Sequence, residues 1–272
     1  MKARAVRFIA PRQVSVDDVA LPEVEPGRIV VRTSFSGISS GTEMLAYRGE
    51  LDPSTDLDES LSALSGNFGY PFSYGYSCVG VVERGTTAIP AGSAIFTFHP
   101  HQDRLVVAES DVVLLSPGVS LREATLFPLV ETALQLTLDA GSVLGETVVV
   151  TGLGPVGLLT SLLLGRAGAR VLAGEPRGWR RDVAASLGIV AVDPADLPSA
   201  VPDGGVPLLV ESSGVPAALA DGLSLLAHEG TALVASWYGT KPVPLPLGAE
   251  FHRRRLTIRS SQVSTIPAAA QG

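Results

Sequence analysis

The chain has 272 residues with a formal net charge of −7 at pH 7, and 46% of its residues are hydrophobic. This length is sufficient for two domains with separate cores, and the acidic balance without a dense run of Lys or Arg argues against nucleic acid as the main partner. A single cysteine excludes an intrachain disulfide, and the lack of a long apolar run predicts a cytoplasmic protein without a signal peptide or membrane partner.

The first part of the chain reads as short strands, because stretches rich in β-branched and aromatic residues alternate with Gly, Pro and Asp. These stretches are residues 2–10, 13–20, 28–37, 77–85 and 94–110. Their spacing predicts an all-β barrel or sandwich within a first domain, residues 1–120. Between them, residues 48–76 are polar and rich in turn formers, which predicts a mobile loop over a site.

From residue 121 the pattern changes to strands that alternate with helices. The expected helices are 121–141, the apolar segment around and after Gly157, 179–188 and 216–230. The expected strands are 147–151, a segment ending near Glu175, 189–193, 206–212, 231–237 and 255–262. Six strands alternating with helices predict an α/β fold with a doubly wound parallel sheet, and a second domain of residues 121–272.

A glycine turn joins the first of these strands to its helix. Gly152, Gly154 and Gly157 form G-x-G-x-x-G, in which the first glycine permits the tight turn, the second lets the backbone approach a pyrophosphate and the third lets the helix pack on the strand. Pro155 suits the first helical turn, which also contains Val156, and the N-terminus of this helix would face the phosphates of a dinucleotide. The alternative is a turn that serves packing only.

The end of the second strand bears on the choice of cofactor. Glu175 lies 23 positions after Gly152, where a carboxylate can accept hydrogen bonds from ribose hydroxyls and would repel a 2′-phosphate. This predicts NAD. Arg177, Arg180 and Arg181 follow at once and leave NADP open, because arginines can bind a 2′-phosphate as well as cover the exposed face of a helix.

Four motifs follow one another along the chain: GISSGTE at 37–43, YGYSCVG at 74–80, FTFHPHQDR at 96–104 and ETALQLTLDAG at 131–141. With the glycine turn, they resemble the medium-chain dehydrogenase/reductase superfamily and, within it, the bacteriochlorophyllide a dehydrogenase-like branch. The resemblance covers nearly the whole chain. It implies a GroES-like β lobe and a Rossmann lobe with the active site in the cleft between them. Members continue past the last strand with a helix-rich return to the first lobe, so the C-terminal return segment is expected to be missing here.

In zinc members of the superfamily, Cys, His and Cys hold the catalytic metal, and an acidic residue follows the His. By the resemblance, the matching positions here are Ser39 or Ser40, then Tyr76 and Ser77, and finally Pro128. Hydroxyls and a proline do not hold zinc, so we expect no metal. The alternative is a metal at the histidine pair of FHPHQD, which the pattern places two apart on one face of a strand.

Without a metal, hydride transfer needs another group to stabilise a developing alkoxide or to take up the hydroxyl proton. Tyr76 can donate a hydrogen bond to a carbonyl oxygen, with Ser40 as second donor or relay and Thr42 beside it. His99 and His101 can shuttle protons at neutral pH. The alternatives are an ordinary aromatic of the cleft wall for Tyr76 and ordered hydrogen-bond partners for the histidines.

Further candidates belong to the second domain. The resemblance places Thr132 against the nicotinamide. Glu131 stands in an otherwise apolar helix, where a carboxylate is costly to bury unless paired, and is interpreted as an acid/base, a cofactor contact or a salt bridge between lobes. Strand ends at the carboxyl edge of an open α/β sheet bind ligands, and this predicts cofactor contacts at Ser212, Ser236 and Trp237.

These observations predict a zinc-independent, NAD(P)-dependent oxidoreductase that acts on a small-molecule secondary alcohol or ketone. The alternatives are a quinone or enoyl reductase, which delivers hydride to a conjugated C=C bond, and a dinucleotide-binding protein without catalysis. Residues 255–262 would form an exposed β edge, and pairing of this edge across a two-fold axis predicts a homodimer.

Overall fold

A computed structural model describes residues 1–61 and 63–263 and divides the chain into two compact units, Met1–Pro128 and Leu129–Gly272. The sequence predicted a boundary after residue 120, and the two units meet later, inside helix α2 (Phe127–Ala140). Within the described ranges, no helix is long and apolar enough to cross a membrane. The cytoplasmic location stays a prediction.

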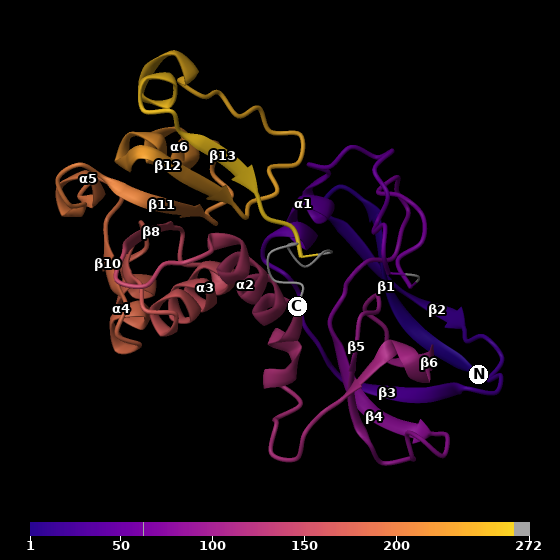
Figure 1. The fold of residues 1–272 in the computed structure, drawn as a ribbon. Coiled ribbons are helices and arrows are strands. Elements are labelled where there is room, and N and C mark those ends of the chain that lie inside the picture. Colours follow the sequence, from indigo (N-terminus) through magenta and orange to yellow (C-terminus); the bar gives the residue numbers. More distant parts are fainter. Residues whose placement is uncertain (62, 264–272) are drawn as a thin grey trace. The chain divides into compact units, whose positions relative to one another are not determined.

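The first unit is built of antiparallel strands (Figure 1). A five-stranded sheet has the order β6-β3-β4-β5-β7, and β1 and β2 form a hairpin. The strands are β1 Lys2–Ala10, β2 Gln13–Ala20, β3 Arg28–Ser36, β4 Cys78–Arg84, β5 Ala94–Thr97, β6 Arg104–Ala108 and β7 Val112–Leu114; helix α1 is Thr42–Arg48, with 3₁₀ turns at Glu109–Asp111 and Glu123–Leu126. The prediction of a β-rich first domain is confirmed.

The segment between α1 and β4, residues 49–61 and 63–77, packs aromatic and aliphatic side chains into the first unit, and its mobility stays a prediction. Leu51, Phe68 and Phe72 are each at most 6% exposed. Phe72 stacks on Phe8 of β1, with ring centroids 5.1 Å apart. The sequence signal for this packing is an aromatic residue at every second position from 68 to 76, because such side chains share one face of an extended chain.

The single strand predicted at 94–110 is in fact two strands, β5 and β6. Residues 98–103, which contain both histidines of FHPHQD, form the connection between them. The expectation that His99 and His101 share one face of a strand is therefore wrong. Pro100 lies between them, and a proline lacks the N–H group that a sheet ladder needs.

The second unit is a six-stranded parallel sheet with helices on both faces (Figure 1). Its order is β10-β9-β8-β11-β12-β13, that of a doubly wound dinucleotide-binding sheet, so the predicted fold is confirmed. Val148 and Val150 of β8 pack with residues of α2, α3 and α4, whereas Val149 packs with residues of α5 and α6. The elements are β8 Thr147–Thr151, α3 Pro155–Arg166, β9 Arg170–Gly174, α4 Gly178–Ser186, β10 Val190–Val192, α5 Leu197–Ala200, β11 Val206–Glu211, α6 Pro216–Gly222, a 3₁₀ turn Leu223–Leu225, β12 Leu226–Val234, a π-helical turn Leu247–Phe251 and β13 Thr257–Ser260.

The helix predicted at 216–230 ends early, at Gly222, and the chain has already entered β12 at Leu226. Leu223, in the 3₁₀ turn, and Leu226, in β12, are both buried in the core between the sheet and helices α5 and α6. Their spacing resembles a helix face, but a turn followed by a strand buries the same leucines. Tertiary packing decides the structure of this short apolar run.

Candidate functional site

The glycine turn after β8 has the local geometry that its sequence predicted. Gly152 has φ +86°, and a Cβ there would lie 2.6 Å from the Cα of Ser213. A Cβ on Gly157 would lie 2.0 Å from the carbonyl oxygen of Gly152. Both positions therefore exclude any larger residue, the first by conformation and contact and the second because α3 packs closely on the turn.

Gly154, in contrast, faces open space. A Cβ built there would meet nothing within 4 Å, so packing within the protein does not require glycine at this position. Gly154 caps α3, and Pro155 is the first residue of this 12-residue helix. The first-turn N–H groups of a helix lack intrahelical partners, and a dinucleotide pyrophosphate needs bare backbone beside them. The turn thus fits a dinucleotide phosphate group.

Ser212 and Ser236 each make a hydrogen bond that holds a neighbouring loop. The Ser212 hydroxyl lies 2.9 Å from the carbonyl oxygen of Gly152 and can donate to it. The Ser236 hydroxyl accepts the N–H of Gly214 at 2.8 Å. Their side chains shape the carboxyl edge of the sheet, and the cofactor contacts predicted at these two serines stay predictions.

A buried carboxylate, Glu211, supports the same edge. It is 0% exposed, and it accepts the N–H of Ser213 at 2.7 Å and the hydroxyl of Tyr238 at 2.6 Å. Burial, with this contact to Glu211, raises the pKa of Tyr238, so the phenol stays protonated and donates. Glu211 thereby holds Ser213 against Gly152, where the GxGxxG turn begins.

Glu175 follows β9 and is 2% exposed. Its Oε2 accepts the N–H of Leu153, inside the glycine turn, at 2.9 Å, and its Oε1 accepts the N–H of Arg177 at 3.0 Å. Burial raises the pKa of Glu175, but these N–H groups and the Arg180 guanidinium outweigh it and hold the pKa below its usual range. The carboxylate thus joins the turns after β8 and β9, and it already has protein partners where a ribose contact was predicted.

Basic side chains surround this carboxylate. Arg180 lies 3.3 Å from Glu175 and 5.2 Å over the ring of Trp179, which is 62% exposed. Arg181 donates to the carbonyl oxygen of Glu175 at 2.7 Å, whereas Arg177 is exposed. The charge that would repel a 2′-phosphate is therefore partly balanced, and the preference for NAD over NADP stays a prediction.

The remaining candidates of the second unit lie apart from this turn in sequence. Glu131 is exposed on α2, so the cost of burying its carboxylate does not arise there, and partial desolvation raises the pKa of its carboxyl. Thr132, its neighbour, is half-buried. Trp237, after β12, is 44% exposed. Their roles stay predictions.

In the first unit, Tyr76 belongs to a group of hydroxyls. Burial raises the pKa of Tyr76 to about 12, and hydrogen bonds from the Ser39 and Thr42 side chains counteract this shift. Thr42, a predicted site residue, is thus beside Tyr76. Ser40 is exposed and Ser39 is 8% exposed, so the structure gives the buried position to the first serine of the motif and not to the predicted second one.

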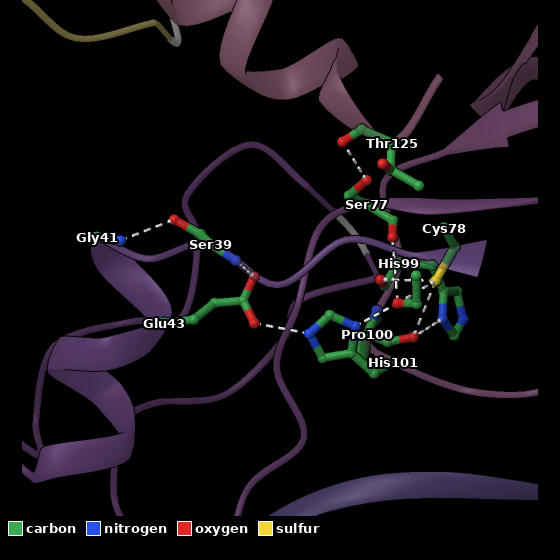
Figure 2. A network of polar contacts seen from close by, with 10 residues as sticks. Ser39, Gly41, Glu43, Ser77, Cys78, His99, Pro100, His101 and Thr125 are labelled. Carbon is green, nitrogen blue, oxygen red and sulfur yellow. Dashed lines mark hydrogen bonds and ion pairs between the residues drawn. The ribbon is translucent and has the colours of Figure 1, made fainter. Parts of the chain in front are cut away.

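A buried network of polar contacts, which the sequence did not predict, joins Glu43, His101 and Ser36 (Figure 2). Glu43 of α1 accepts the N–H of Ser39 at 2.8 Å and contacts Nε2 of His101 at 2.6 Å. Nδ1 of His101 contacts the hydroxyl of Ser36 at the end of β3. The sequence signal for this network was the last residue of GISSGTE, Glu43, because it is the one ionisable residue in the motif.

His99, the histidine predicted to be catalytic, contributes its backbone to this network, because its carbonyl oxygen accepts from the Sγ of Cys78 at 3.4 Å and Cys78 contacts Ser36. Nδ1 of His99 lies 2.9 Å from the carbonyl oxygen of Pro100 and donates to it (Figure 2). Burial lowers the pKa of His99, so its ring stays neutral at pH 7. Of the two histidine rings, the structure therefore joins that of His101, and not that of His99, to the Tyr76 group.

The donor set around Tyr76 does not fit a catalytic zinc ion. Zinc in proteins takes thiolate, imidazole or carboxylate ligands, whereas Ser39, Thr42 and Tyr76 offer hydroxyls, and Glu43 and His101 bind each other. Among residues 1–61 and 63–263, no group of three or more His, Cys, Asp or Glu side chains is placed to hold a metal.

Comparison with known proteins gives matches in both units. A family model for zinc-binding dehydrogenases matches residues 155–271. The curated 2-desacetyl-2-hydroxyethyl bacteriochlorophyllide A dehydrogenase of Cereibacter sphaeroides is 29% identical over 268 residues, covering 89% of this chain and 76% of the relative. (R,R)-butanediol dehydrogenase of Bacillus subtilis is 26% identical, covering 97% of this chain and 84% of the relative.

The solved structures agree in fold. A protein described as a zinc-binding dehydrogenase from Sinorhizobium meliloti 1021, crystallised with NADP, matches with a TM-score of 0.77 at 22% identity. The match covers 96% of this chain and 84% of that one. This likeness shows the fold, and it is the Sinorhizobium protein that was crystallised with NADP.

Proposed function

We propose that the chain, which is similar to zinc-binding dehydrogenases and to curated alcohol dehydrogenases, is a member of the medium-chain dehydrogenase/reductase superfamily. We propose that it transfers hydride between NAD(P) and a secondary alcohol or ketone without a catalytic zinc ion. The curated relatives support the reaction class, because their names specify a butanediol and a hydroxyethyl group as substrates. Both are small alcohol groups, in one case carried by a large ring system. The alcohol group is therefore the shared chemistry.

The observation that carries the cofactor part of this proposal is the open space at Gly154 beside two glycines that packing does require. Bare backbone at the N-terminus of α3 is the arrangement that a pyrophosphate needs. Glu175 holds the turn through the N–H of Leu153. The bound nicotinamide supplies or accepts the hydride, and the protein binds, orients and stabilises charge.

The group proposed to act on the substrate is Tyr76. With a pKa of about 12 its phenol is protonated at neutral pH, so in ketone reduction it donates a hydrogen bond, and then its proton, to the oxygen that becomes an alcohol, and recovers a proton from water. The Ser39 and Thr42 side chains counteract the rise of the Tyr76 pKa that burial causes, so they favour negative charge on the phenol oxygen. A phenol donor of this kind stabilises the negative charge that develops on a carbonyl oxygen when hydride reaches the carbon.

The test is consumption of NADH or NADPH by the purified full chain with matched panels of ketones and conjugated enones. Turnover of ketones, and oxidation of the matching secondary alcohols with NAD(P), supports the proposal. Turnover of enones alone would instead assign the protein as a C=C reductase, because the same phenol can polarise a conjugated carbonyl. Tight cofactor binding without turnover on either panel would mean that it binds dinucleotides only.

We also propose that the chain forms a homodimer through β13. This strand lies at the edge of the sheet, next to β12, and its Thr257 and Arg259 are exposed. An exposed strand edge tends to pair with another chain, and a two-fold axis closes such a pair. Light scattering at micromolar concentration should give twice the monomer mass, and a monomer would contradict the proposal.

A further inference from the structure

Glu43 and His101 are two buried ionisable side chains that the hydride transfer itself does not need. They are 1% and 6% exposed, and 2.6 Å separates Oε2 of Glu43 from Nε2 of His101. An ionised carboxylate only accepts hydrogen bonds, so Nε2 carries the hydrogen. In the neutral ring, Nδ1 is then the acceptor, and the hydroxyl of Ser36 donates to it.

Ser36 suits either state of this ring. Its hydroxyl also lies 3.2 Å from the carbonyl oxygen of Ser77. It can donate to Nδ1 of His101, or accept from Nδ1–H while it donates to Ser77. Ser36 therefore pairs Nδ1 in either tautomer, so the group that faces Nε2, the carboxylate of Glu43, decides which nitrogen carries the hydrogen.

Each end of the Glu43–His101 pair touches a segment that places Tyr76. On one side, Glu43 accepts the N–H of Ser39, whose side chain is one of the groups that lower the pKa of the Tyr76 phenol against burial. On the other side, the His101 ring lies against Gly75, the residue before Tyr76. A Cβ on Gly75 would lie 2.7 Å from Nε2 and Cδ2 of the ring.

We propose that Glu43 and His101 are positioning residues for Tyr76, with His101 held as the Nε2–H tautomer between Glu43 and Ser36. The pair fixes the Ser39 backbone and the path of the chain at Gly75, and so fixes the direction in which the phenol points. The inference rests on the proposed function, since this direction affects turnover only if Tyr76 acts on the substrate. A group that acts through another residue should lose its effect when that residue is removed.

The first experiment needs neither substrate nor cofactor. Nitrogen-15 NMR of the full chain distinguishes the tautomers of His101 and His99, assigned by His101→Gln and His99→Gln. We expect Nε2–H for His101 and Nδ1–H for His99, because His99 donates from Nδ1 to Pro100. An Nδ1–H tautomer for His101 would overturn the inference.

Glu43→Gln sharpens this test. The glutamine side chain has a carbonyl oxygen that accepts and an NH₂ group that donates. The fixed N–H of Ser39 should bind the carbonyl oxygen. The amide N–H₂ then faces Nε2 of His101, so the ring should switch to Nδ1–H, with Ser36 turned to the Ser77 carbonyl. An unchanged tautomer in a folded variant would contradict the network.

The second experiment is a double-mutant cycle on turnover. Glu43→Gln should lower kcat about tenfold with the cofactor Kd unchanged, and should have no further effect in a Tyr76→Phe background. Ser36→Ala should lower kcat less, and Ser34→Ala, an exposed serine on the same strand, should leave it unchanged. Equal losses in both backgrounds would show a merely structural role and overturn the inference. If Tyr76→Phe alone leaves turnover unchanged, the role proposed for Tyr76 fails, while the tautomers still decide the network.

Discussion

The glycine turn of the second unit and the polar network of the first place their groups by opposite means. The turn offers backbone: two glycines that packing requires and a third that faces open space. Its elements lie within residues 152–175, with Glu175 binding the N–H of Leu153. The network offers side chains, and Glu43 and His101 are 58 residues apart in the chain. A backbone site tolerates changes of side chain around it, whereas a side-chain network depends on each member.

The largest effect on turnover is expected at Tyr76, the residue that the polar network is proposed to position. Tyr76→Phe removes one hydroxyl and should lower turnover about 100-fold or more, the scale for loss of an oxyanion donor. The cofactor Kd should stay the same, because the turn that binds it belongs to the second unit. Steady-state kinetics and fluorescence titration with NADH measure the two quantities. A Phe variant with unchanged kcat would remove Tyr76 from the mechanism.

A smaller effect is expected at the turn, where stability and binding should separate. Gly154→Val puts a side chain into open space, so the melting temperature should hold while cofactor affinity falls about tenfold, or about 1.4 kcal/mol. Gly157→Ala is the matched change, and its Cβ would lie 2.0 Å from a carbonyl oxygen, so it should lower the melting temperature. Full cofactor affinity in Gly154→Val would mean that no pyrophosphate approaches this backbone.

A third prediction concerns acid stability. Hydrogen bonds and Arg180 hold the pKa of Glu175 below its usual range despite burial. A lowered pKa in the folded state means that the carboxylate stabilises the protein at neutral pH and loses this contribution as the pH falls through the folded pKa. Glu175→Gln should therefore flatten the fall of the melting temperature between about pH 5 and about pH 3. Replacement of an exposed carboxylate, Glu146→Gln, is the control. An equal change in the pH dependence of the melting temperature in both variants would contradict the stabilising role of Glu175.

Removal of metal ions is expected to have no effect. Chelation should leave turnover and melting temperature unchanged, because hydroxyls surround Tyr76 where a zinc site would need thiolate or imidazole. Metal analysis before and after chelation is the control. Activity that is lost on chelation and restored by zinc would show that the network is a metal site after all.

The same difference explains what the sequence could predict. Gly152, Gly154 and Gly157 act through their own backbone and a regular strand–helix junction, so a local pattern was sufficient. The alternation of strands and helices likewise predicted the sheet. Where prediction failed, as at the 216–230 helix, a short apolar run had two structures that bury the same leucines, and contacts elsewhere in the fold decide between them.

The network was out of reach for a different reason. Choosing His101 over His99 required the path of the chain around Pro100, and choosing Ser39 over Ser40 required the start of α1. The two candidates in each pair are residues of the same type, so the sequence alone does not distinguish them. Only the three-dimensional positions of Glu43 and Gly75 distinguish them, and no spacing rule connects those residues to the FHPHQD segment.

The division into two units also separates the natural fluorophores of the chain. Its two tryptophans, Trp179 and Trp237, both belong to the second unit, whereas Tyr238 is the only one of the five tyrosines outside the first unit. Tryptophan emission therefore reports the melting of the dinucleotide-binding sheet alone, and the tyrosine signal reports mainly the β-rich unit. A denaturant titration followed at both wavelengths would measure whether the two units unfold as one cooperative body or in succession, without any label.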